Sequence, residues 1–227
     1  MKVTAIIAAA GKGKRFGGPI NKQFIKVHHK TILQHTVEKY ETSAMVHEIV
    51  IVTAIEHVKA LQTNSQLNQL SKISGIIAGG AERQESVWNG LQYIDKSTDI
   101  VLIHDGVRPC FSHDLIYRSV EACKKHNAVI AGIVPKDTIK EKQHNYVKQT
   151  YDRSNLVAVQ TPQAFQYDLI YYAYKKGLSQ GFSTTDDSMM VENLGHPVFI
   201  IEGEYKNIKI TSPEDLILAR EFLKGMT

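Results

Sequence analysis

The feature that most limits the fold of this chain is a regular alternation of short apolar runs with stretches of helical periodicity. The apolar runs are typical of buried strands, and the stretches between them repeat apolar residues every three or four positions. The predicted strands are 3–9, 48–53, 72–78, 99–104 and 128–134, and the predicted helices are 31–42, 55–61, 81–94 and 114–125. Strand followed by helix, repeated, indicates βαβ units. The sequence therefore predicts an α/β fold with a doubly wound, mostly parallel sheet, in a single domain over residues 1–227.

A polar, alternating segment interrupts this rhythm at about 136–160. It is typical of a hairpin, with a turn at His144-Asn145. A two-stranded hairpin buries little surface by itself. We therefore expect a protruding β-arm that packs on a second subunit, giving a homodimer; the alternative is a flexible loop that covers the site.

The pattern resumes after this arm. We expect helices at 167–176 and 186–194, a strand at 196–202, a short β segment at 208–211 and a last helix that ends near residue 223. Ser212-Pro213, followed by two acidic residues, is a typical start for that last helix.

The loop after the first strand is rich in glycine and in positive charge. It contains Gly11, Gly13, Gly17 and Gly18, with Lys12, Lys14 and Arg15 among them and Lys22 just beyond. Glycine lets a backbone turn sharply and approach a ligand closely, and clustered cations favour a phosphate. The loop matches neither the P-loop motif nor the dinucleotide fingerprint. Two interpretations stay open, a phosphate-binding loop and a plain connection with solvated lysines.

Ligands of doubly wound sheets bind beyond the carboxyl ends of the strands. Asp105 follows the predicted strand 99–104 directly, where a carboxylate is placed to hold a divalent cation on a nucleoside triphosphate. The alternative is that Asp105 caps a turn or pairs with Arg108. Asp186 and Asp187 have two possible roles as well, a helix cap or a second carboxylate that faces a metal.

Further candidates lie in other loops at the same predicted edge. Gly80 precedes a helix start, where backbone N–H groups and the hydroxyl of Ser86 are able to bind a phosphate or a base edge; an ordinary helix start is the alternative. Arg153, Lys206 and Lys209 add positive charge beyond what one triphosphate needs. They indicate a second phosphorylated substrate, unless they are solvated surface residues.

Composition excludes several classes of function. The net charge of +4 comes without any Lys/Arg block, so we expect no nucleic-acid partner. The chain has no run of 18 apolar residues, and its two cysteines lack a metal-binding or redox spacing. The first apolar run leads straight into the glycine-rich loop, so we expect no signal peptide and a cytoplasmic protein that binds no membrane. The ten histidines show no zinc-binding spacing, and no G-x-S-x-G motif is present.

The ordered set of motifs resembles the 2-C-methyl-D-erythritol 4-phosphate cytidylyltransferase family of the non-mevalonate isoprenoid pathway. The matching motifs are AAAGKGKR at 8–15, KQ at 22–23, GGAER at 79–83, HDGVRP at 104–109, DTIK at 137–140, QTPQAF at 160–165, TDD at 185–187 and NIKIT at 207–211. They span nearly the whole chain, and their order is more specific than any one of them.

This resemblance implies a Rossmann-like nucleotidyltransferase fold and an Mg²⁺-dependent transfer of a cytidylyl group. The substrates would be CTP and 2-C-methyl-D-erythritol 4-phosphate, an alcohol phosphate, and one product would be pyrophosphate. The implied catalytic residues are Arg15, Lys22, Arg153 and Lys209. The implied nucleotide-binding residues are Ala9, Ala10, Gly11, Gly13, Gly80, Ser86 and Asp105, with Asp105 beside the metal. The implied residues for the alcohol phosphate are Thr138, Arg153, Lys209 and Arg108, and Thr138 and Arg153 would reach across a dimer interface.

Two departures and two alternatives accompany the resemblance. Gly106-Val107 stands where the family usually has two alanines, and Val157 stands where a Trp is common. The closest alternative function is a ribitol-5-phosphate cytidylyltransferase of teichoic-acid synthesis, which shares several of these motifs. A non-catalytic nucleotide-binding module is the other alternative, and it predicts loss of the cations, which are all present.

Overall fold

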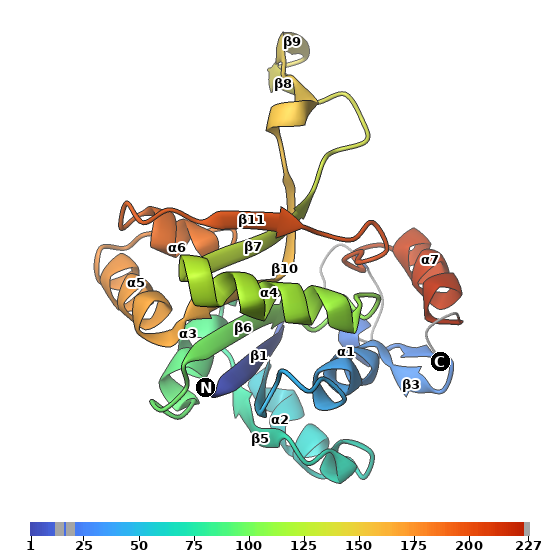
Figure 1. Cartoon of the computed structure of the whole chain (residues 1–227). Helices are drawn as coiled ribbons and strands as arrows, with labels where there is room; N and C mark the ends of the chain where they lie inside the picture. Colours follow the sequence, from blue (N-terminus) through green and yellow to red (C-terminus); the bar gives the residue numbers. More distant parts are fainter. Residues whose placement is uncertain (12–15, 17–20, 225–227) are drawn as a thin grey trace.

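The computed structural model describes residues 1–11, 16 and 21–224, and within them seven strands form one central sheet (Figure 1). The strand order is β11-β7-β10-β6-β1-β4-β5. The strands are β1 (Val3–Ala9), β4 (Glu48–Thr53), β5 (Ile73–Ala78), β6 (Ile100–Asp105), β7 (Ala128–Ile133), β10 (Ala158–Gln166) and β11 (Phe199–Glu202). Neighbouring strands are parallel except where β10 pairs with β6 and β7.

Helices cover both faces of this sheet, as predicted. One face carries α1 (Ile32–Glu41), α2 (Ile55–Gln62) and α4 (His113–His126), and the other carries α3 (Arg83–Tyr93), α5 (Tyr167–Ser179) and α6 (Ser188–Glu192). Alternate residues of β1 pack into the two cores, Ala5 and Ile7 into the first and Ile6 into the second. The doubly wound, mostly parallel α/β prediction is thus confirmed.

Side chains at the helix starts explain why these elements begin where they do. Thr31 and Gln34 form a reciprocal capping box on α1, and the hydroxyl of Ser112 accepts a hydrogen bond from the backbone N–H of Leu115 at the start of α4. The last helix, α7 (Pro213–Lys224), begins at a proline, as predicted. Its Asp215 carboxylate accepts hydrogen bonds from the backbone N–H groups just before the helix.

The strand β10 was not predicted, and it lies in the middle of the sheet. Its first residues were predicted to belong to the arm, because the segment up to Gln160 is polar and alternating. Pro162, just beyond, is unfavourable in a central strand and hides the signal of β10. The register of β10 against β7 shifts between Gln160 and Gln163, and this irregularity accommodates Pro162. An antiparallel strand therefore enters a sheet that sequence periodicity predicts as parallel.

Three smaller predictions need correction. The segment 208–211 is not a strand; it packs beside the loop that follows β6, where the backbone N–H of Ile210 bonds to the carbonyl of Val107. The strand expected at 196–202 begins only at Phe199, after Pro197. The helix expected at 186–194 is shorter and is α6.

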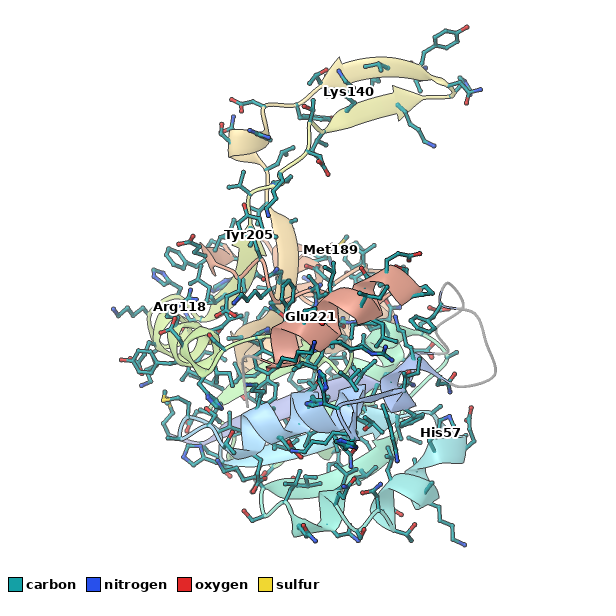
Figure 2. The ribbon with its side chains drawn as sticks, turned by 90° about the vertical axis from the view of Figure 1, so that its right-hand side faces the viewer. His57, Arg118, Lys140, Met189, Tyr205 and Glu221 are labelled. Carbon is teal, nitrogen blue, oxygen red and sulfur yellow. The ribbon has the colours of Figure 1, made fainter. Side chains whose placement is uncertain are left out.

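The arm stands away from the body of the protein (Figures 1 and 2). It consists of β8 (Lys140–Gln143) and β9 (Tyr146–Thr150), an antiparallel pair whose turn contains His144 with a positive φ of 54°. Every residue of β9 is exposed. A second small hairpin, β2 (Lys26–Val27) with β3 (Lys30–Thr31), lies near α7, and short 3-10 helices cover Lys22–Phe24, Leu67–Gln69 and Arg153–Asn155.

The order of the sheet reverses at β1. From β1 the chain crosses to β4 and β5 on one side, and it returns to β6 on the other. In the register of the parallel pair β1–β6, Ala8 lies opposite Asp105, so the carboxyl ends of these strands are adjacent. This is the position at which doubly wound sheets bind ligands. Among the described residues, no helix is long and apolar enough to span a membrane.

Candidate active site

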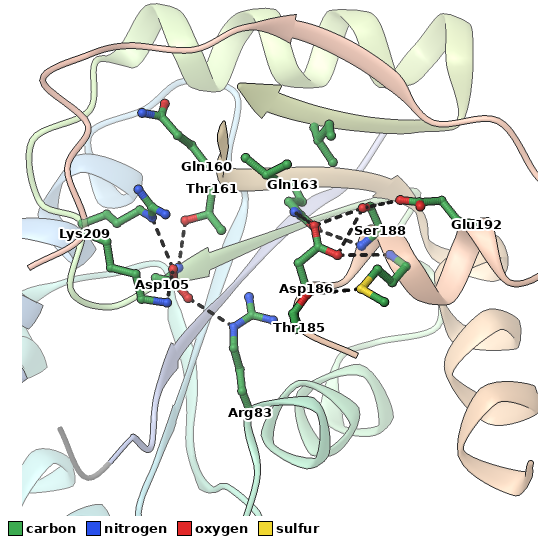
Figure 3. A pocket seen from close by; sticks show the side chains of 14 residues that line it. Arg83, Asp105, Gln160, Thr161, Gln163, Thr185, Asp186, Ser188, Glu192 and Lys209 are labelled. Atoms are coloured by element: carbon green, nitrogen blue, oxygen red, sulfur yellow. Dashed lines mark hydrogen bonds and ion pairs between the residues drawn. The ribbon is translucent and has the colours of Figure 1, made fainter. Parts of the chain in front are cut away.

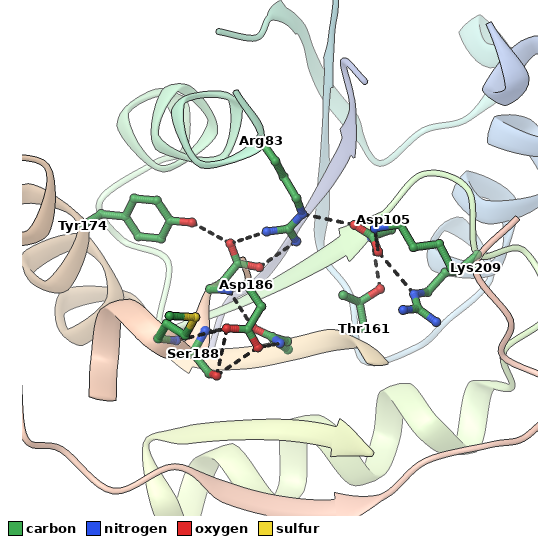
Figure 4. A network of polar contacts seen from close by, with 11 residues as sticks. Arg83, Asp105, Thr161, Tyr174, Asp186, Ser188 and Lys209 are labelled. Carbon is green, nitrogen blue, oxygen red and sulfur yellow. Dashed lines mark hydrogen bonds and ion pairs between the residues drawn. The ribbon is translucent and has the colours of Figure 1, made fainter. Parts of the chain in front are cut away.

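Asp105, the last residue of β6, is the centre of the site. Arg83 Nε lies 3.2 Å from its Oδ1, while Arg108 Nε at 3.2 Å and Lys209 Nζ at 3.0 Å contact its Oδ2. We call these four residues the Asp105 cluster (Figures 3 and 4). Burial by itself raises the pKa of the Asp105 carboxyl, but the charges of Arg83, Lys209 and Arg108 outweigh this effect and hold the pKa well below its usual range.

A cavity of about 470 Å³ opens beside the Asp105 cluster, which forms its cationic end (Figure 3). The opposite end is acidic, since the hydroxyl of Ser188 lies 3.0 Å from a carboxylate oxygen of Asp186 and 2.7 Å from one of Glu192. The wall between the two ends includes Thr161 and Gln163 of β10. Arg83, Arg108 and Lys209 carry three positive charges against the two carboxylates that they contact, Asp105 and Asp187. The cationic end therefore keeps a surplus of positive charge, which suits a phosphate.

The carboxyl end of β1 lies close to the start of α3. A Cβ atom built on Gly79 would be 2.7 Å from the Cβ of Ala10 and 2.5 Å from Oγ of Ser86, so only glycine allows this approach. The Ser86 hydroxyl, which is buried, accepts a hydrogen bond from the backbone N–H of Gly80 at 3.1 Å. The structure therefore brings together the loop ends at Ala10 and Gly80 with Ser86 in the first turn of α3.

The glycine-rich loop is anchored by a residue that the sequence analysis gave no role. The side-chain amide of Gln23, which is 1 % exposed, donates to the carbonyl oxygens of Ala9 at 2.9 Å and Gly11 at 3.2 Å. This ties the loop start to the short helix that contains Lys22. The predictions for Gly13 and Arg15 lie outside the described residues.

The helix start at α3 differs from its prediction in one respect. The backbone N–H groups of Ala81 and Glu82 donate to the carboxylate of Glu85, at 2.7 and 3.3 Å, and that of Gly80 donates to Ser86. These donors are already engaged by the protein. A phosphate at this helix start would therefore compete with the side chains of Glu85 and Ser86.

Lys209 is held in place by its neighbour Asn207. Asn207 is fully buried, and its amide donates to the carbonyl of Thr161 at 2.8 Å and to Oε1 of Gln160 at 3.3 Å. The backbone carbonyl of Asn207 accepts a hydrogen bond from Arg108 Nη1 at 2.9 Å. The Asn207 contacts fix the segment with Lys209 against β10, and sequence reasoning missed them because they join residues more than 40 positions apart.

Thr138 and Arg153 do not join the others. Both lie at the base of the arm, both are exposed, and neither lines the cavity of its own chain. Arg153 instead donates to the backbone carbonyl of Lys136. Within one chain, therefore, Asp105, Arg108 and Lys209 come together, whereas the two arm residues remain apart from them.

Asp105 is the residue that would hold a divalent metal. Among the residues that the structure describes, no group of three or more His, Cys, Asp and Glu side chains is arranged around a metal position. Mg²⁺ commonly takes one or two carboxylates and completes its coordination with water and substrate phosphates, so one carboxylate at the phosphate site fits this ion. Because three cations already balance the charge of Asp105, phosphate oxygens would supply most of the ligands.

Comparison with known proteins gives one consistent result. A family model described as 2-C-methyl-D-erythritol 4-phosphate cytidylyltransferase matches residues 3–225. The chain is 45 % identical to a protein of that name from Clostridium tetani, over 98 % of this chain and 91 % of the relative, and 46 % identical to one from Alkaliphilus oremlandii, over 98 % and 95 %. A crystal structure titled 4-diphosphocytidyl-2C-methyl-D-erythritol synthase, from Anaerococcus prevotii, superposes with a TM-score of 0.87 at 33 % identity, over 98 % of this chain and 96 % of that one.

Proposed function

The chain belongs to the 2-C-methyl-D-erythritol 4-phosphate cytidylyltransferase family, and from this premise we propose that its site transfers the cytidylyl group of CTP to 2-C-methyl-D-erythritol 4-phosphate. The products are 4-diphosphocytidyl-2-C-methyl-D-erythritol and pyrophosphate. One observation supports this most. The cavity with its cationic end lies at the adjacent carboxyl ends of β1 and β6, where the loops proposed to bind the nucleotide begin.

The proposed reaction joins two phosphates. An oxygen of the alcohol phosphate attacks the α-phosphorus of CTP, and a new phosphorus–oxygen bond forms. The bond from the α-phosphorus to the bridging oxygen breaks, and pyrophosphate leaves with the electron pair. A phosphate monoester oxygen is already ionised at neutral pH, so no general base is needed. The work of the protein is positioning and charge neutralisation.

The residues that the family resemblance implies have proposed parts in this reaction, and two of them, Arg15 and Gly13, lie outside the described residues. Lys22 stabilises charge on the triphosphate, and we assign the same role to Arg15. Arg108 and Lys209, at the cationic end of the cavity, bind the alcohol phosphate. The nucleotide lies against the backbone of Ala9, Ala10, Gly11, Gly13 and Gly80 and beside Ser86.

We propose Mg²⁺ as the cofactor, with Asp105 as its protein ligand. When bound, this ion neutralises negative charge on the phosphates. The test is removal of the metal: EDTA should abolish pyrophosphate release, and added Mg²⁺ should restore it. Full turnover in excess EDTA would exclude a metal requirement.

We also propose a homodimer formed through the arm. Two observations support it: the tip of the arm carries exposed apolar side chains, Tyr146 at 81 % and Val147 at 61 %, and the exposed Thr138 and Arg153 lie away from their own cavity. In the proposed dimer, a second copy covers the apolar tip of the arm, and Thr138 and Arg153 reach the cavity of that second copy. A cytoplasmic location stays a prediction.

The experiment that tests the function measures pyrophosphate release from CTP with each acceptor. We expect release with 2-C-methyl-D-erythritol 4-phosphate and little with ribitol 5-phosphate, the acceptor of the alternative function. Release with ribitol 5-phosphate alone would replace the proposed substrate. Absence of release with either acceptor, in the presence of Mg²⁺, would leave the non-catalytic nucleotide-binding module as the better description.

A further inference from the structure

Arg83, the first residue of α3, bridges two carboxylates that lie 82 positions apart in the chain. Its Nε contacts Asp105 Oδ1 at 3.2 Å (Figure 4). Its Nη1 and Nη2 contact the two oxygens of Asp187 at 2.9 and 2.7 Å. The contact with Asp187 is bidentate, which fixes the plane of a guanidinium as well as its position. The direction of the Nε–H toward Asp105 is therefore set from the Asp187 side.

Asp187 is buried and held by several hydrogen bonds. Its side chain is 0 % exposed, and the hydroxyl of Tyr174 on α5 donates to its Oδ1 at 2.6 Å. Its backbone N–H donates to the amide oxygen of Gln163 on β10 at 3.1 Å. A buried carboxylate is unfavourable unless charge and hydrogen bonds compensate it, and here Arg83 and Tyr174 do so. Burial raises the pKa of Tyr174 well above its usual value, so this hydroxyl keeps the proton that it donates.

We propose that Asp187 and Tyr174 are positioning residues for the reaction, which hold Arg83 so that it fixes the Asp105 carboxylate in the cavity. This inference rests on the proposed function, because it concerns the same site. It assigns a role to two side chains that the reaction does not otherwise use.

The geometry of Asp105 shows why Arg83 matters. Among the described side chains, Arg83 contacts Oδ1 of Asp105, whereas Arg108 and Lys209 both contact Oδ2. Cations on both oxygens prevent rotation of the carboxylate. If Arg83 loses its orientation, Asp105 is held through Oδ2 alone. Its carboxylate can then rotate, which changes its contact with Lys209, the proposed ligand of the alcohol phosphate.

The decisive variant is Tyr174→Phe, with Tyr167→Phe as its matched control. Both tyrosines are buried on α5 and each loses one hydroxyl, but the Tyr167 hydroxyl bonds to the carbonyl of Leu91, outside this network. We expect Tyr174→Phe to lower kcat/KM for the alcohol phosphate about tenfold, as when a hydrogen bond to a charged group is lost. The KM for CTP should rise as well, because Asp105 is also the proposed ligand of the metal on the triphosphate.

A stronger variant is Asp187→Asn, which removes the charge that holds Arg83. It should lower kcat/KM more than Tyr174→Phe does. If it fails to fold, Tyr174→Phe decides the matter. Equal kinetics for Tyr174→Phe and Tyr167→Phe would overturn the proposal.

A measurement independent of activity separates this inference from the proposed function. The Nε–H signal of Arg83 in a ¹H–¹⁵N NMR spectrum, identified by its loss in Arg83→Gln, should exchange with water faster in Tyr174→Phe than in Tyr167→Phe. If the wild-type protein is inactive but shows this difference in exchange, the proposed function is refuted, whereas the positioning of Arg83 by Asp187 and Tyr174 is supported. An active wild-type protein with no difference in exchange refutes the positioning role.

Discussion

Lys22 lies in the short 3-10 helix Lys22–Phe24, directly after the glycine-rich loop. The amide of Gln23 ties this helix to the carboxyl end of β1, so the Lys22 backbone is held at the edge where a triphosphate is proposed to bind. A cation fixed at that edge can stabilise charge that develops in the transition state without moving during the reaction.

The first prediction is that Lys22→Ala lowers kcat strongly. Loss of one such group removes about 2–4 kcal/mol of transition-state stabilisation, which corresponds to a roughly 30- to 1000-fold lower kcat. Steady-state pyrophosphate release measures this change. Lys26→Ala, at the exposed residue of the neighbouring strand β2, is the control and should remain near wild type. Near-normal turnover in Lys22→Ala would remove that residue from the mechanism.

The second prediction concerns the two thiols. Cys110 and Cys123 are fully buried, and burial raises the pKa of each to about 12. In the unfolded chain each thiol ionises near its ordinary pKa of about 8.5. The free energy of unfolding is therefore unaffected by these thiols below about pH 8.5, and it falls as the pH rises toward 12. Each thiol then lowers the free energy of unfolding by up to about 1.4 kcal/mol per pH unit.

Alkylation checks this directly. At pH 8.5 the folded protein should react with iodoacetamide far more slowly than the protein in urea, because the thiolate is the reactive form and the folded thiols are protonated. Equal rates in the two states would mean that the thiols are accessible and ionised in the folded protein.

Residues at the strand ends could be anticipated from sequence, because a carboxylate directly after a buried strand must lie at the sheet edge. That argument placed Asp105 correctly at the edge, and the pairing with Arg108, which was the alternative interpretation, is present at 3.2 Å. It could not assign a role to Arg83 or Asp187, since their contact joins residues 104 positions apart and no local pattern records it. Asp187 was interpreted as a cap or a metal-facing group, and the structure instead pairs it with Arg83.

At the scale of elements, β10 connects more of the site than any other strand. It runs antiparallel between β6 and β7, lines the cavity through Thr161 and Gln163, and anchors Asn207 from the segment that holds Lys209. The parallel part of the sheet was predictable, because buried runs and helical stretches alternate there. The place of β10 was not, because Pro162 breaks the local signal of a central strand.

The third prediction tests this anchor. Asn207→Ala leaves the buried carbonyl of Thr161 without the donor that lies 2.8 Å away, so the free energy of unfolding should fall by about 1–3 kcal/mol. The KM for the alcohol phosphate should rise as well, because Lys209 loses its support. Urea denaturation and steady-state kinetics measure the two effects. Asn193→Ala, at an exposed position, is the control, and an equally small effect of both substitutions would contradict the anchoring role.

At the scale of the whole molecule, the body of the protein and the arm divide the proposed site between them. The fourth prediction follows from a two-fold dimer in which each cavity uses Lys22 of one subunit and Arg153 of the other. Lys22→Ala and Arg153→Ala should each be nearly inactive alone. Mixed and reassociated, they should recover about a quarter of wild-type activity, because half of the dimers are mixed and one of their two sites is intact.

Two measurements would contradict this arrangement. One is a mixture whose activity equals the average of the two separate variants after subunit exchange has been verified. The other is a fully active monomer in analytical ultracentrifugation at micromolar concentration. The sequence indicated an arm that buries little surface by itself. The local pattern of one chain does not encode which surface of a second copy the arm contacts.

If a second copy completes each cavity, as proposed, the arm also determines how much of this protein a cell must make. An enzyme whose sites are each finished by a second molecule loses specific activity on dilution. Below the dissociation constant of the pair, the number of complete sites falls with the square of the protein concentration. Flux through this step would then respond more than proportionally to a change in expression level, and a modest fall in abundance would slow the reaction steeply.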